Sequence, residues 1–369
     1  MTVCHLTSLH QRNDTRIFLK QCCSLSVAGF EVSLIVADGL GNAVINGVSI
    51  FDVGETTAGR LSRFISTTQK VYEKAVDLGA DVYHFHDPEL MFHAYRLKLL
   101  GKKVIYDAHE DLPRQLMSKP YLGSLTKKVL PFLLERIENI LAARFDSVIT
   151  ATPFIRDRFL KINKNTIDIN NYPLLQELHS VDYSIQKKNQ ICYIGGITAI
   201  RGIEELVKAC DLIDGELVLA GKFNSRELEK KMRSLPGWKK VKYLGFINRE
   251  DARKILAESK AGVVNFLAEP NHINAQPNKM FEYMSASLPV IASHFPLWKS
   301  IVEGNKCGVC VNPGNPQELA KAMNSFLNND AKVLSYGKNG RNAVEEKYNW
   351  VLEEKKLISH YTFVSKRKN

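Results

Sequence analysis

The chain has 369 residues, 45% of them hydrophobic and 24% charged, which is the composition of a soluble globular protein of about two domains. No apolar run approaches the ~20 residues that a bilayer-spanning helix needs, and the first residues do not resemble a signal peptide, so we expect a cytoplasmic protein. The formal net charge of +11 predicts an anionic partner, but aromatic and basic residues do not interleave, which argues against a nucleic acid.

Strand-like runs followed by helical runs recur along the first half of the chain, and this alternation predicts a parallel, doubly wound α/β sheet. In chain order the pattern predicts strand 3–8, helix 15–28, strands 32–37 and 48–53, helix 61–78, strand 82–86, helix 90–100 and strand 104–107. Gly39 and Gly41 have the spacing of a dinucleotide fingerprint but lack its third small residue and a following helix, so we expect a loop there.

Most of the positive charge lies just after these elements. Residues 1–111 contain 11 basic and 13 acidic side chains, whereas residues 112–164 contain 10 basic and 4 acidic ones. Within the basic segment, 121–144 has the period of an amphipathic helix, with an apolar stripe beside Lys127, Lys128, Arg136 and Arg144. Such a helix can rest on an anionic membrane surface, or it can be a core helix with a solvated basic edge, and the sequence leaves both interpretations open.

The alternation restarts after a polar, poorly periodic stretch. Further strands are predicted at 190–196, 217–220, 241–244, 262–266, 290–292 and 308–311, and a last helix at 350–364. We therefore expect two Rossmann-like domains, at 1–170 and 190–348, joined by a linker at 171–189 and followed by a C-terminal helical segment at 349–369. The seven Cys, an odd number spread over these elements, are typical of reduced thiols.

The most informative stretch is 277–311, where a turn, a helix, a buried strand, a second helix and a further strand follow one another. Pro277 and Asn278 mark a helix start, and the free amides there favour an anion such as a diphosphate. Glu282, one turn into the helix, can accept hydrogen bonds from hydroxyls such as those of a ribose. The pattern thus predicts phosphate and hydroxyl recognition side by side.

These residues resemble the carboxylate signature of the retaining, GT-B-fold glycosyltransferases of family four, and the resemblance covers nearly the whole chain, in the manner of bacterial polysaccharide and O-antigen enzymes. In that family a first Glu contacts the donor sugar, and a second Glu, eight positions later, binds the ribose. Glu282 matches the second position, whereas Asn274 stands at the first. An amide can still hydrogen-bond a sugar hydroxyl, but it brings no negative charge. The resemblance also implies an interdomain cleft and a last helix that crosses back onto the first domain.

Several further residues are expected to bind the donor. A strand ends at Gly195 and Gly196 and a helix follows Arg201, so backbone and guanidinium can both approach a diphosphate. Similar enzymes usually carry a second basic residue here, and Lys222 or Lys279 can supply it, although each can equally be a surface charge. The resemblance assigns the nucleobase to the backbone near Ile247. Asn278, Lys279 and Met280, which open the helix after Pro277, complete the predicted donor set.

The first domain supplies the other candidates. His109 follows a predicted strand, and the resemblance places it near the reacting carbon of the sugar, so we count it as catalytic with Asn274 and Glu282. The acceptor is expected to contact seven residues: His10, Asp14, Arg16, His84, His86, Asp87 and Glu110. Capping of a helix explains Asp14 equally well. His84 and His86 have a spacing that can bind a metal, but no third ligand is evident and this fold's transfer needs no metal, so we favour a polar wall.

The sequence and its resemblance together predict a glycosyltransferase that moves a hexose or N-acetylhexosamine from a nucleoside diphosphate sugar, with uridine favoured, to a saccharide acceptor. The resemblance implies that the transfer retains configuration and needs no metal or cofactor. The acceptor is plausibly lipid-linked, and the enzyme would then work in the cytoplasm on the inner face of the plasma membrane, in cell-surface polysaccharide synthesis. A nucleotide-sugar epimerase of the same fold is the nearest alternative. A basic nucleic-acid-binding protein is the alternative from another class.

Overall fold

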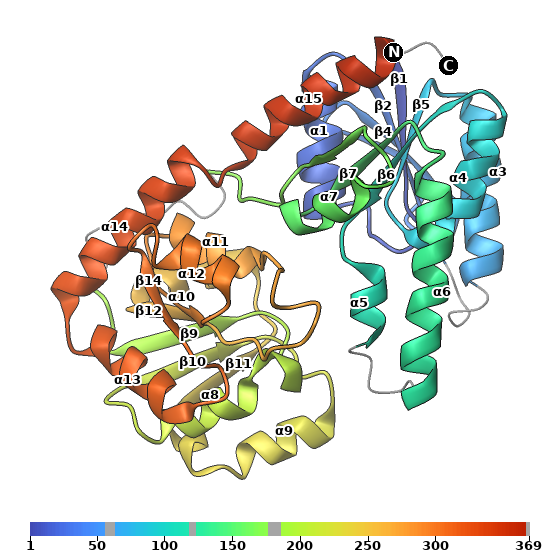
Figure 1. Cartoon of the computed structure of the whole chain (residues 1–369). Coiled ribbons are helices and arrows are strands. Elements are labelled where there is room, and N and C mark those ends of the chain that lie inside the picture. Colours follow the sequence, from blue (N-terminus) through green and yellow to red (C-terminus); the bar gives the residue numbers. More distant parts are fainter. Residues whose placement is uncertain (56–62, 118–122, 176–185, 367–369) are drawn as a thin grey trace. The chain divides into compact units, whose positions relative to one another are not determined.

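The computed structural model describes residues 1–55, 63–117, 123–175 and 186–366. The chain divides into two compact units, and each is described here by itself (Figure 1). Unit 1 combines Met1–Asn171 with Trp350–Asn369, and unit 2 is Tyr172–Asn349. Most of the predicted linker at 171–189 lies outside the described residues.

Unit 1 is built on an eight-stranded sheet with the order β3-β4-β2-β1-β5-β6-β7-β8, which is parallel except for the β3–β4 pair. Its strands are β1 (Thr2–Leu6), β2 (Glu31–Val36), β3 (Ala43–Ile45), β4 (Val48–Asp52), β5 (Val82–Phe85), β6 (Lys103–Ala108), β7 (Ser147–Thr150) and β8 (Thr166–Asp168). The order reverses between β1 and β5, and in an open parallel sheet the carboxyl ends at such a reversal form a crevice.

The strand β3 was not predicted. The sequence predicts a loop in this region, but Ala43–Ile45 pairs antiparallel with β4. Asn46 and Gly47, between the two strands, both have positive φ angles, of 53° and 76°. An Asn-Gly pair in this conformation makes the tight hairpin turn that matches the twist of the strands. This dipeptide is therefore a sequence signal for the hairpin that hydrophobic periodicity alone does not show.

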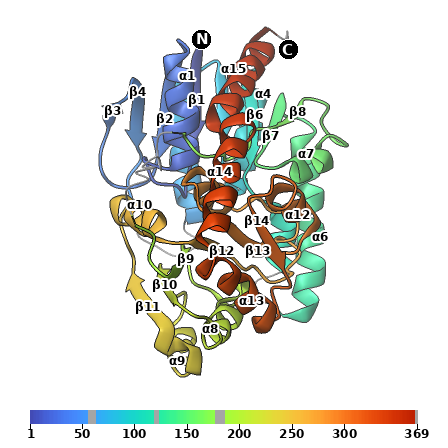
Figure 2. The ribbon, with the colours of Figure 1, turned by 90° about the vertical axis from the view of Figure 1, so that its left-hand side faces the viewer.

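Helices cover both faces of this sheet. They are η1 (Thr15–Cys22), α1 (Cys23–Val27), η2 (Arg63–Thr67), α3 (Thr68–Leu78), η3 (Pro88–Leu90), α4 (Met91–Leu99), α5 (Leu112–Met117), α6 (Ser124–Ala142), α7 (Pro153–Phe159) and α15 (Trp350–Lys366). Asp14 caps η1, which is wound as a π-helix, by accepting from the amides of Arg16 and Ile17. The helix α15 packs against η1 and α1 (Figure 2) and is tied to α1 by a hydrogen bond from Trp350 Nε1 to Ser24 Oγ at 2.9 Å.

Unit 2 is built on a fully parallel six-stranded sheet with the order β11-β10-β9-β12-β13-β14. Its strands are β9 (Gln190–Ile194), β10 (Glu216–Ala220), β11 (Val241–Gly245), β12 (Ala261–Val264), β13 (Val290–Ser293) and β14 (Gly308–Val311). Its helices are η4 (Ala199–Arg201), α8 (Ile203–Cys210), α9 (Arg226–Arg233), η5 (Pro236–Lys240), α10 (Arg249–Glu258), α11 (Asn278–Ser285), α12 (Pro296–Val302), α13 (Pro316–Leu327) and α14 (Asp330–Glu346).

The sheet of unit 2 has a hydrophobic core on each face. Successive residues of β9 belong to opposite cores: Ile191 and Tyr193 lie with α8 and α13, and Cys192 lies with α11. This alternation explains why the strands of unit 2 appear in the sequence as nearly continuous apolar runs. The predicted fold class, α/β with two doubly wound parallel sheets, is confirmed. None of the helices in the described ranges has the length and hydropathy that crossing a bilayer requires.

Candidate active site

In unit 2, the predicted diphosphate-binding residues meet where β9 ends. Gly195 has a φ of 133°, and a Cβ at this residue would lie 3.0 Å from Lys279 Nζ. A Cβ on Gly196 would lie 2.9 Å from Arg201 Nη1, which donates to the Gly196 carbonyl at 3.0 Å. Both glycines therefore leave room for basic side chains beside exposed backbone.

Lys279 is the most unusual residue of this group. Its side chain is only 8% exposed, and Nζ has no hydrogen-bond partner among the described residues. The ammonium lies 3.7 Å from the centre of the Tyr193 ring. Burial, reinforced by the charge of Arg201, lowers the pKa of Lys279 well below its usual value. A buried amine without a partner costs free energy, so an anion arriving here would gain a binding group already in place.

The helix α11 begins at the same place, as predicted. Its N-cap residue, Pro277, makes no side-chain capping hydrogen bond, so this residue leaves the first amides open to a ligand. Asn278 is exposed and Glu282 is half-buried. Met280 is fully buried in the core, and its amide donates to the Pro277 carbonyl at 3.0 Å, so its side chain serves packing.

The remaining donor candidates surround this turn less closely. The exposed Lys222 lies 5.2 Å from the ring of Phe246, and Ile247 is half-buried against the core that contains α11. Asn274 is half-buried in the segment before α11. Trp298 Nε1 anchors that segment by donating to the carbonyl of Ala275 at 2.7 Å.

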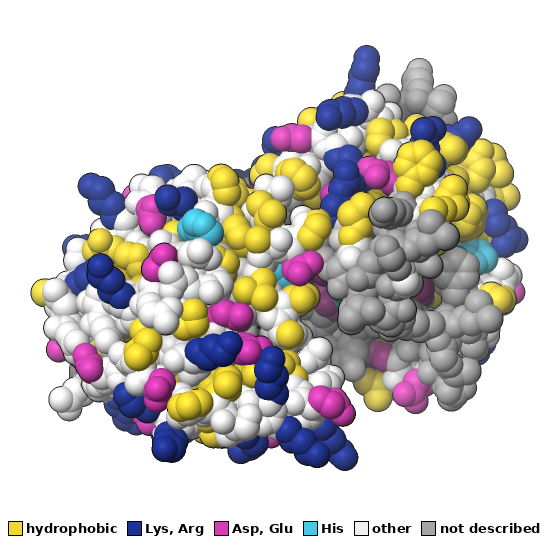
Figure 3. Space-filling model, turned by 60° about the horizontal axis from the view of Figure 1, so that its bottom comes forward, with side chains coloured by type: hydrophobic (Ala, Val, Ile, Leu, Met, Phe, Trp, Pro, Cys, Tyr) yellow, Lys and Arg dark blue, Asp and Glu magenta, His cyan; other side chains and the backbone are white. Residues whose placement is uncertain are grey.

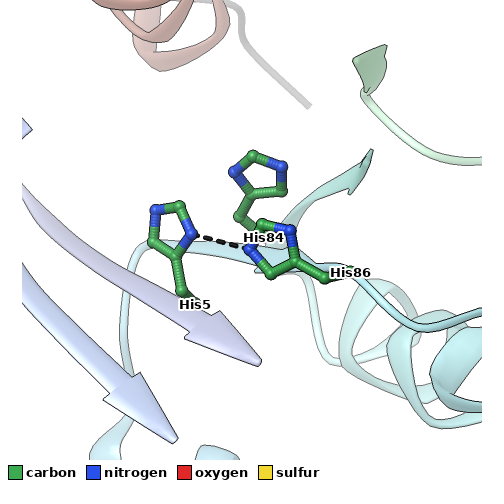
Figure 4. Close-up of side chains that lie close together, drawn as sticks. All are labelled: His5, His84 and His86. Carbon is green, nitrogen blue, oxygen red and sulfur yellow. Dashed lines mark hydrogen bonds between the residues drawn. The ribbon is translucent and has the colours of Figure 1, made fainter. Parts of the chain in front are cut away.

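In unit 1, polar side chains gather at the ends of β1, β5 and β6. His5 on β1 pairs with His84 on β5, and the imidazoles of His5, His84 and His86 lie together (Figure 4). His5 Nδ1 lies 2.9 Å from His86 Nε2, and His86 Nδ1 lies 3.1 Å from His109 Nε2. His84 is 0% and His86 2% exposed, so the predicted acceptor wall lies inside the unit, whereas the His109 side chain is 18% exposed.

Asp107, on β6, contacts His86 and His109 of this group. Its carboxylate accepts from Arg16 at 2.7 and 3.2 Å and from Gln21 Nε2 at 2.8 Å. Burial would raise the pKa of Asp107, but the charge of Arg16 and the donors around it hold that pKa well below its usual value. Arg16 also donates to the carbonyl of Ile169 at 2.7 Å, so its guanidinium is committed within unit 1.

Apart from the buried Asp87, the other acceptor candidates lie nearer the surface. His10 Nδ1 lies 3.2 Å from Asp14 Oδ2, and His10 Nε2 lies 3.5 Å from Asp87 Oδ1. Asp87 is buried and accepts from the hydroxyl of Thr7 at 2.8 Å and from the amide of Ser8. The exposed Glu110 accepts from Gln115. The rings of His10 and His109, with centres 5.3 Å apart, form the accessible edge of this cluster.

Among the residues that the structure describes, two sets of side chains have the spacing of metal ligands. They are His5, His84 and His86, and His86, Asp107 and His109, and in each set the candidate atoms lie within 4.8 Å of one another. His5 lies where a third ligand would stand beside His84 and His86, and the sequence did not indicate it. However, the guanidinium of Arg16 is a fixed positive charge 2.7 Å from the Asp107 carboxylate, and close contacts already join the ring nitrogens of His5, His86 and His109. A metal cation would have to face that charge, so the residues suit hydrogen bonding better.

Comparison with known proteins assigns the family. The sequence model described as Glycosyltransferase Family 4 matches residues 17–169, and the one described as Glycosyl transferases group 1 matches residues 176–343. The chain belongs to the glycosyltransferases of family four. A glycosyltransferase of Methanocaldococcus jannaschii is 28% identical over 179 residues, which are 47% of this chain and 45% of that protein. The chain spans roughly half the length of the curated relatives it matches.

Solved structures confirm the GT-B fold of this glycosyltransferase. Sucrose-phosphate synthase from Thermosynechococcus elongatus has a TM-score of 0.80 at 19% identity, with 99% of both chains covered. Anabaena HepE, solved in complex with UDP-glucose, has a TM-score of 0.76 at 16% identity, covering 98% of this chain and 100% of HepE.

Four residues of the unit 1 cluster were not predicted: His5, Gln21, Asp107 and Tyr361. Asp107 carried a signal, because it lies two residues before His109, and alternate residues of a strand share a face. His5 could have been found by pairing the first strand with 82–86. Tyr361 carried none, since its helix meets these strands only in the folded unit.

Proposed function

We propose that this glycosyltransferase moves a sugar, with retention of configuration, from a nucleoside diphosphate donor to a saccharide acceptor. The observation that carries this proposal is the buried Lys279 beside Gly195 at the start of α11, whose amine has no hydrogen-bond partner within the part of the chain that the structure describes. An amine, a guanidinium and free amides in one place suit a diphosphate. A uridine nucleotide is favoured, because HepE was solved with UDP-glucose.

The departing diphosphate gains negative charge as the bond to the sugar breaks, so Lys279, Arg201 and the amides of α11 would stabilise the transition state. Glu282 would hold the ribose, and Asn274 a hydroxyl of the donor sugar. In unit 1, His109 would contact the sugar near its reacting carbon, with His10 beside it on the acceptor side. We assign no metal and no cofactor to this reaction.

We further propose that the acceptor is lipid-linked and that the enzyme works in the cytoplasm, at the inner face of the membrane. Support comes from α6, where Val129, Phe132, Leu133, Ile137 and Ile140 are each at least 40% exposed. Arg136 stacks over Phe132 at 4.9 Å, and Arg144 lies at the end of the helix. Apolar side chains beside basic ones suit an anionic lipid surface. Lys127 and Lys128 have side chains outside the described residues.

Two sets of ligands test the donor proposal. Uridine, guanosine and adenosine diphosphate sugars are compared for the rise that each causes in melting temperature, because a ligand that binds only the folded state stabilises it. The best donor is then incubated with candidate acceptors, and free nucleoside diphosphate is measured. Release that depends on the acceptor supports transfer. Isomerisation of the donor without an acceptor would instead identify an epimerase.

The variant Glu282→Ala is the matched test of the ribose assignment. We expect the melting temperature without ligand to stay unchanged, and donor turnover to fall at least tenfold, because a hydrogen bond to a charged group is worth about 1.5–3 kcal/mol. Turnover equal to that of the wild type would contradict the assignment.

A nucleic acid remains the alternative from another class. On the face shown in Figure 3, the described Lys and Arg side chains are interspersed with Asp and Glu and form no continuous basic strip. Steeply salt-dependent oligonucleotide binding, without binding of any nucleotide sugar, would favour this alternative.

A further inference from the structure

A single series of contacts runs through unit 1 from α15 to β6. His84 Nδ1 lies 2.6 Å from the hydroxyl of Tyr361, and that hydroxyl lies 3.2 Å from His5 Nε2. His5 Nδ1 lies 2.9 Å from His86 Nε2, and His86 Nδ1 lies 3.3 Å from Asp107 Oδ2. His5 and His86 each use a different nitrogen for their two neighbours in this series, and the Tyr361 oxygen contacts both His84 and His5, so the contacts connect the five residues in one series.

Burial favours the neutral form of His5, His84 and His86, although the Asp107 carboxylate opposes this effect. His5, His84 and His86 are fully or almost fully buried. Burial lowers the pKa of each of them well below its usual value, and repulsion between the neighbouring imidazoles adds to this effect. Each imidazole therefore carries one proton, on one nitrogen, and the other nitrogen must accept.

Asp107 sets the direction of the hydrogen bonds. A carboxylate only accepts, so His86 Nδ1 has to donate to it, and His86 Nε2 then accepts from His5 Nδ1. His5 Nε2 in turn accepts from the Tyr361 hydroxyl, and the Tyr361 oxygen accepts from His84 Nδ1. The reverse order would place the lone pair of His86 Nδ1 3.3 Å from the carboxylate, which is closer than the 3.7 Å at which the chosen order leaves the lone pair of His84 Nε2. The geometry thus favours one tautomer, with the proton on Nδ1, for all three histidines.

We propose that Tyr361, His5, His86 and Asp107 are positioning residues, which hold His109 in one tautomer and one orientation for sugar transfer. His109 Nε2 lies 3.3 Å from Asp107 Oδ2 and 3.1 Å from His86 Nδ1. The carboxylate of Asp107 can only accept, so His109 Nε2, which faces the same oxygen, donates to Asp107 as well. His109 Nδ1 is then the nitrogen that can accept a hydrogen bond from a hydroxyl of the bound sugar. This inference rests on the proposed function.

The tautomers can be measured without any activity. In protein labelled with ¹⁵N-histidine, long-range nitrogen–proton couplings show which nitrogen of each ring is protonated, and His→Gln variants at positions 5, 84 and 86 assign the signals. We expect Nδ1–H for all three residues at pH 7. A proton on Nε2 of His5 or His86, or an imidazolium at either, would overturn the proposal even if transfer were established.

The coupling to His109 is tested by Tyr361→Phe, which removes only the hydroxyl. Tyr83→Phe is the matched control, because Tyr83 on β5 is also buried. Its hydroxyl donates to the Ala75 carbonyl at 2.6 Å and takes no part in the hydrogen-bonded series of His84, Tyr361, His5, His86 and Asp107. We expect kcat to fall about tenfold in Tyr361→Phe with an unchanged KM for the donor. Tyr83→Phe should keep the kcat of the wild type. Equal kcat values in the two variants would overturn the proposal.

The pH profile of kcat separates positioning from a structural role. Asp107 on β6, His86 directly after β5, and His10 and Asp14 in the segment before η1 surround His109. Tyr361→Phe leaves all of these in place, so a displaced pH profile in this variant would report a changed His109. A pH profile that coincides with that of the wild type would count against the proposed positioning role of this hydrogen-bonded series. Stoichiometric zinc in the purified protein would also overturn it, because metal-bound nitrogens cannot donate these hydrogen bonds.

Discussion

Lys279 is the residue at which stability and ligand binding are expected to oppose each other. Its amine is buried without a hydrogen-bond partner among the described residues, so Lys279→Met should raise the free energy of unfolding by about 1–3 kcal/mol. The same change removes a cation from the diphosphate site and should weaken nucleoside diphosphate binding at least tenfold. Chemical denaturation and titration calorimetry measure the two effects.

Lys260→Met is the control for this variant. Lys260 Nζ is also largely buried but donates to the Leu327 carbonyl and lies 2.7 Å from Asp330. Its replacement should not stabilise the fold and should leave nucleotide binding unchanged. If Lys279→Met were less stable than the wild type, or bound the nucleotide equally well, the assigned role of this lysine would be wrong.

At this scale the sequence predicted residues whose setting is local. Arg201, Lys279 and Glu282 lie within a turn of a glycine pair or a helix start, and such motifs can be recognised from spacing. His5 and Asp107 could not be assigned in the same way, since their partners come from neighbouring strands and from α15. The roles of Arg201, Lys279 and Glu282, like those of Asn274 and of the acceptor residues, stay predictions.

Among the elements, the turn after β10 depends on glycine for a steric reason. Gly221 has a φ of 145°, and a Cβ there would lie 1.9 Å from the carbonyl oxygen of Gly195. We expect Gly221→Ala to destabilise unit 2 by on the order of 3–5 kcal/mol. Gly245→Ala, at a φ of 66° with open space around it, should cost only about 1–2 kcal/mol. Urea unfolding compares them, and equal losses would show that the predicted clash is relieved.

The helix α6 is the element on which the membrane proposal depends. Phe132→Glu places a negative charge on its exposed apolar face, so binding to vesicles of phosphatidylglycerol should fall several-fold in a sedimentation assay. Leu334→Glu, on the exposed face of α14 in unit 2, is the matched control and should bind as the wild type does. Binding of the wild type should weaken at high salt. Unchanged binding by Phe132→Glu would rule out this face.

Element prediction succeeded where periodicity is long or the strand is buried on both faces. The strands of unit 2 and the helix α15 were expected near their observed positions for this reason. The strand β3 was missed because three residues are too few to show a period. The π-helical winding of η1 was also not predicted, since its helical pattern carries no signal for the wider turn.

For the molecule as a whole, acid should be strongly destabilising. His5, His84 and His86 have pKa values well below their usual range through burial, and burial lowers the pKa of His360 to about 4. Below pH 6.5 the unfolded chain binds protons that the folded chain does not, so stability is present above pH 6.5 and is lost as pH falls toward 4. For each such histidine, the free energy of unfolding falls by up to about 1.4 kcal/mol for each pH unit below 6.5.

Melting temperature measured between pH 7.5 and pH 4 checks this expectation. His360→Phe, which removes one of the titrating groups, should flatten the curve relative to the wild type. A melting temperature that does not change between pH 6.5 and pH 5 would show that these histidines are already protonated in the folded protein.

Because unit 1 contains both Met1–Asn171 and Trp350–Asn369, its assembly is tied to the order of synthesis. The ribosome releases β1, with His5, long before it makes Tyr361 on α15, and the whole of Tyr172–Asn349 emerges in between. Until α15 is synthesised, the histidines of the amino-terminal sheet therefore have no Tyr361 hydroxyl to bind. Unit 2 is contiguous in sequence, so it can complete its fold before unit 1 does.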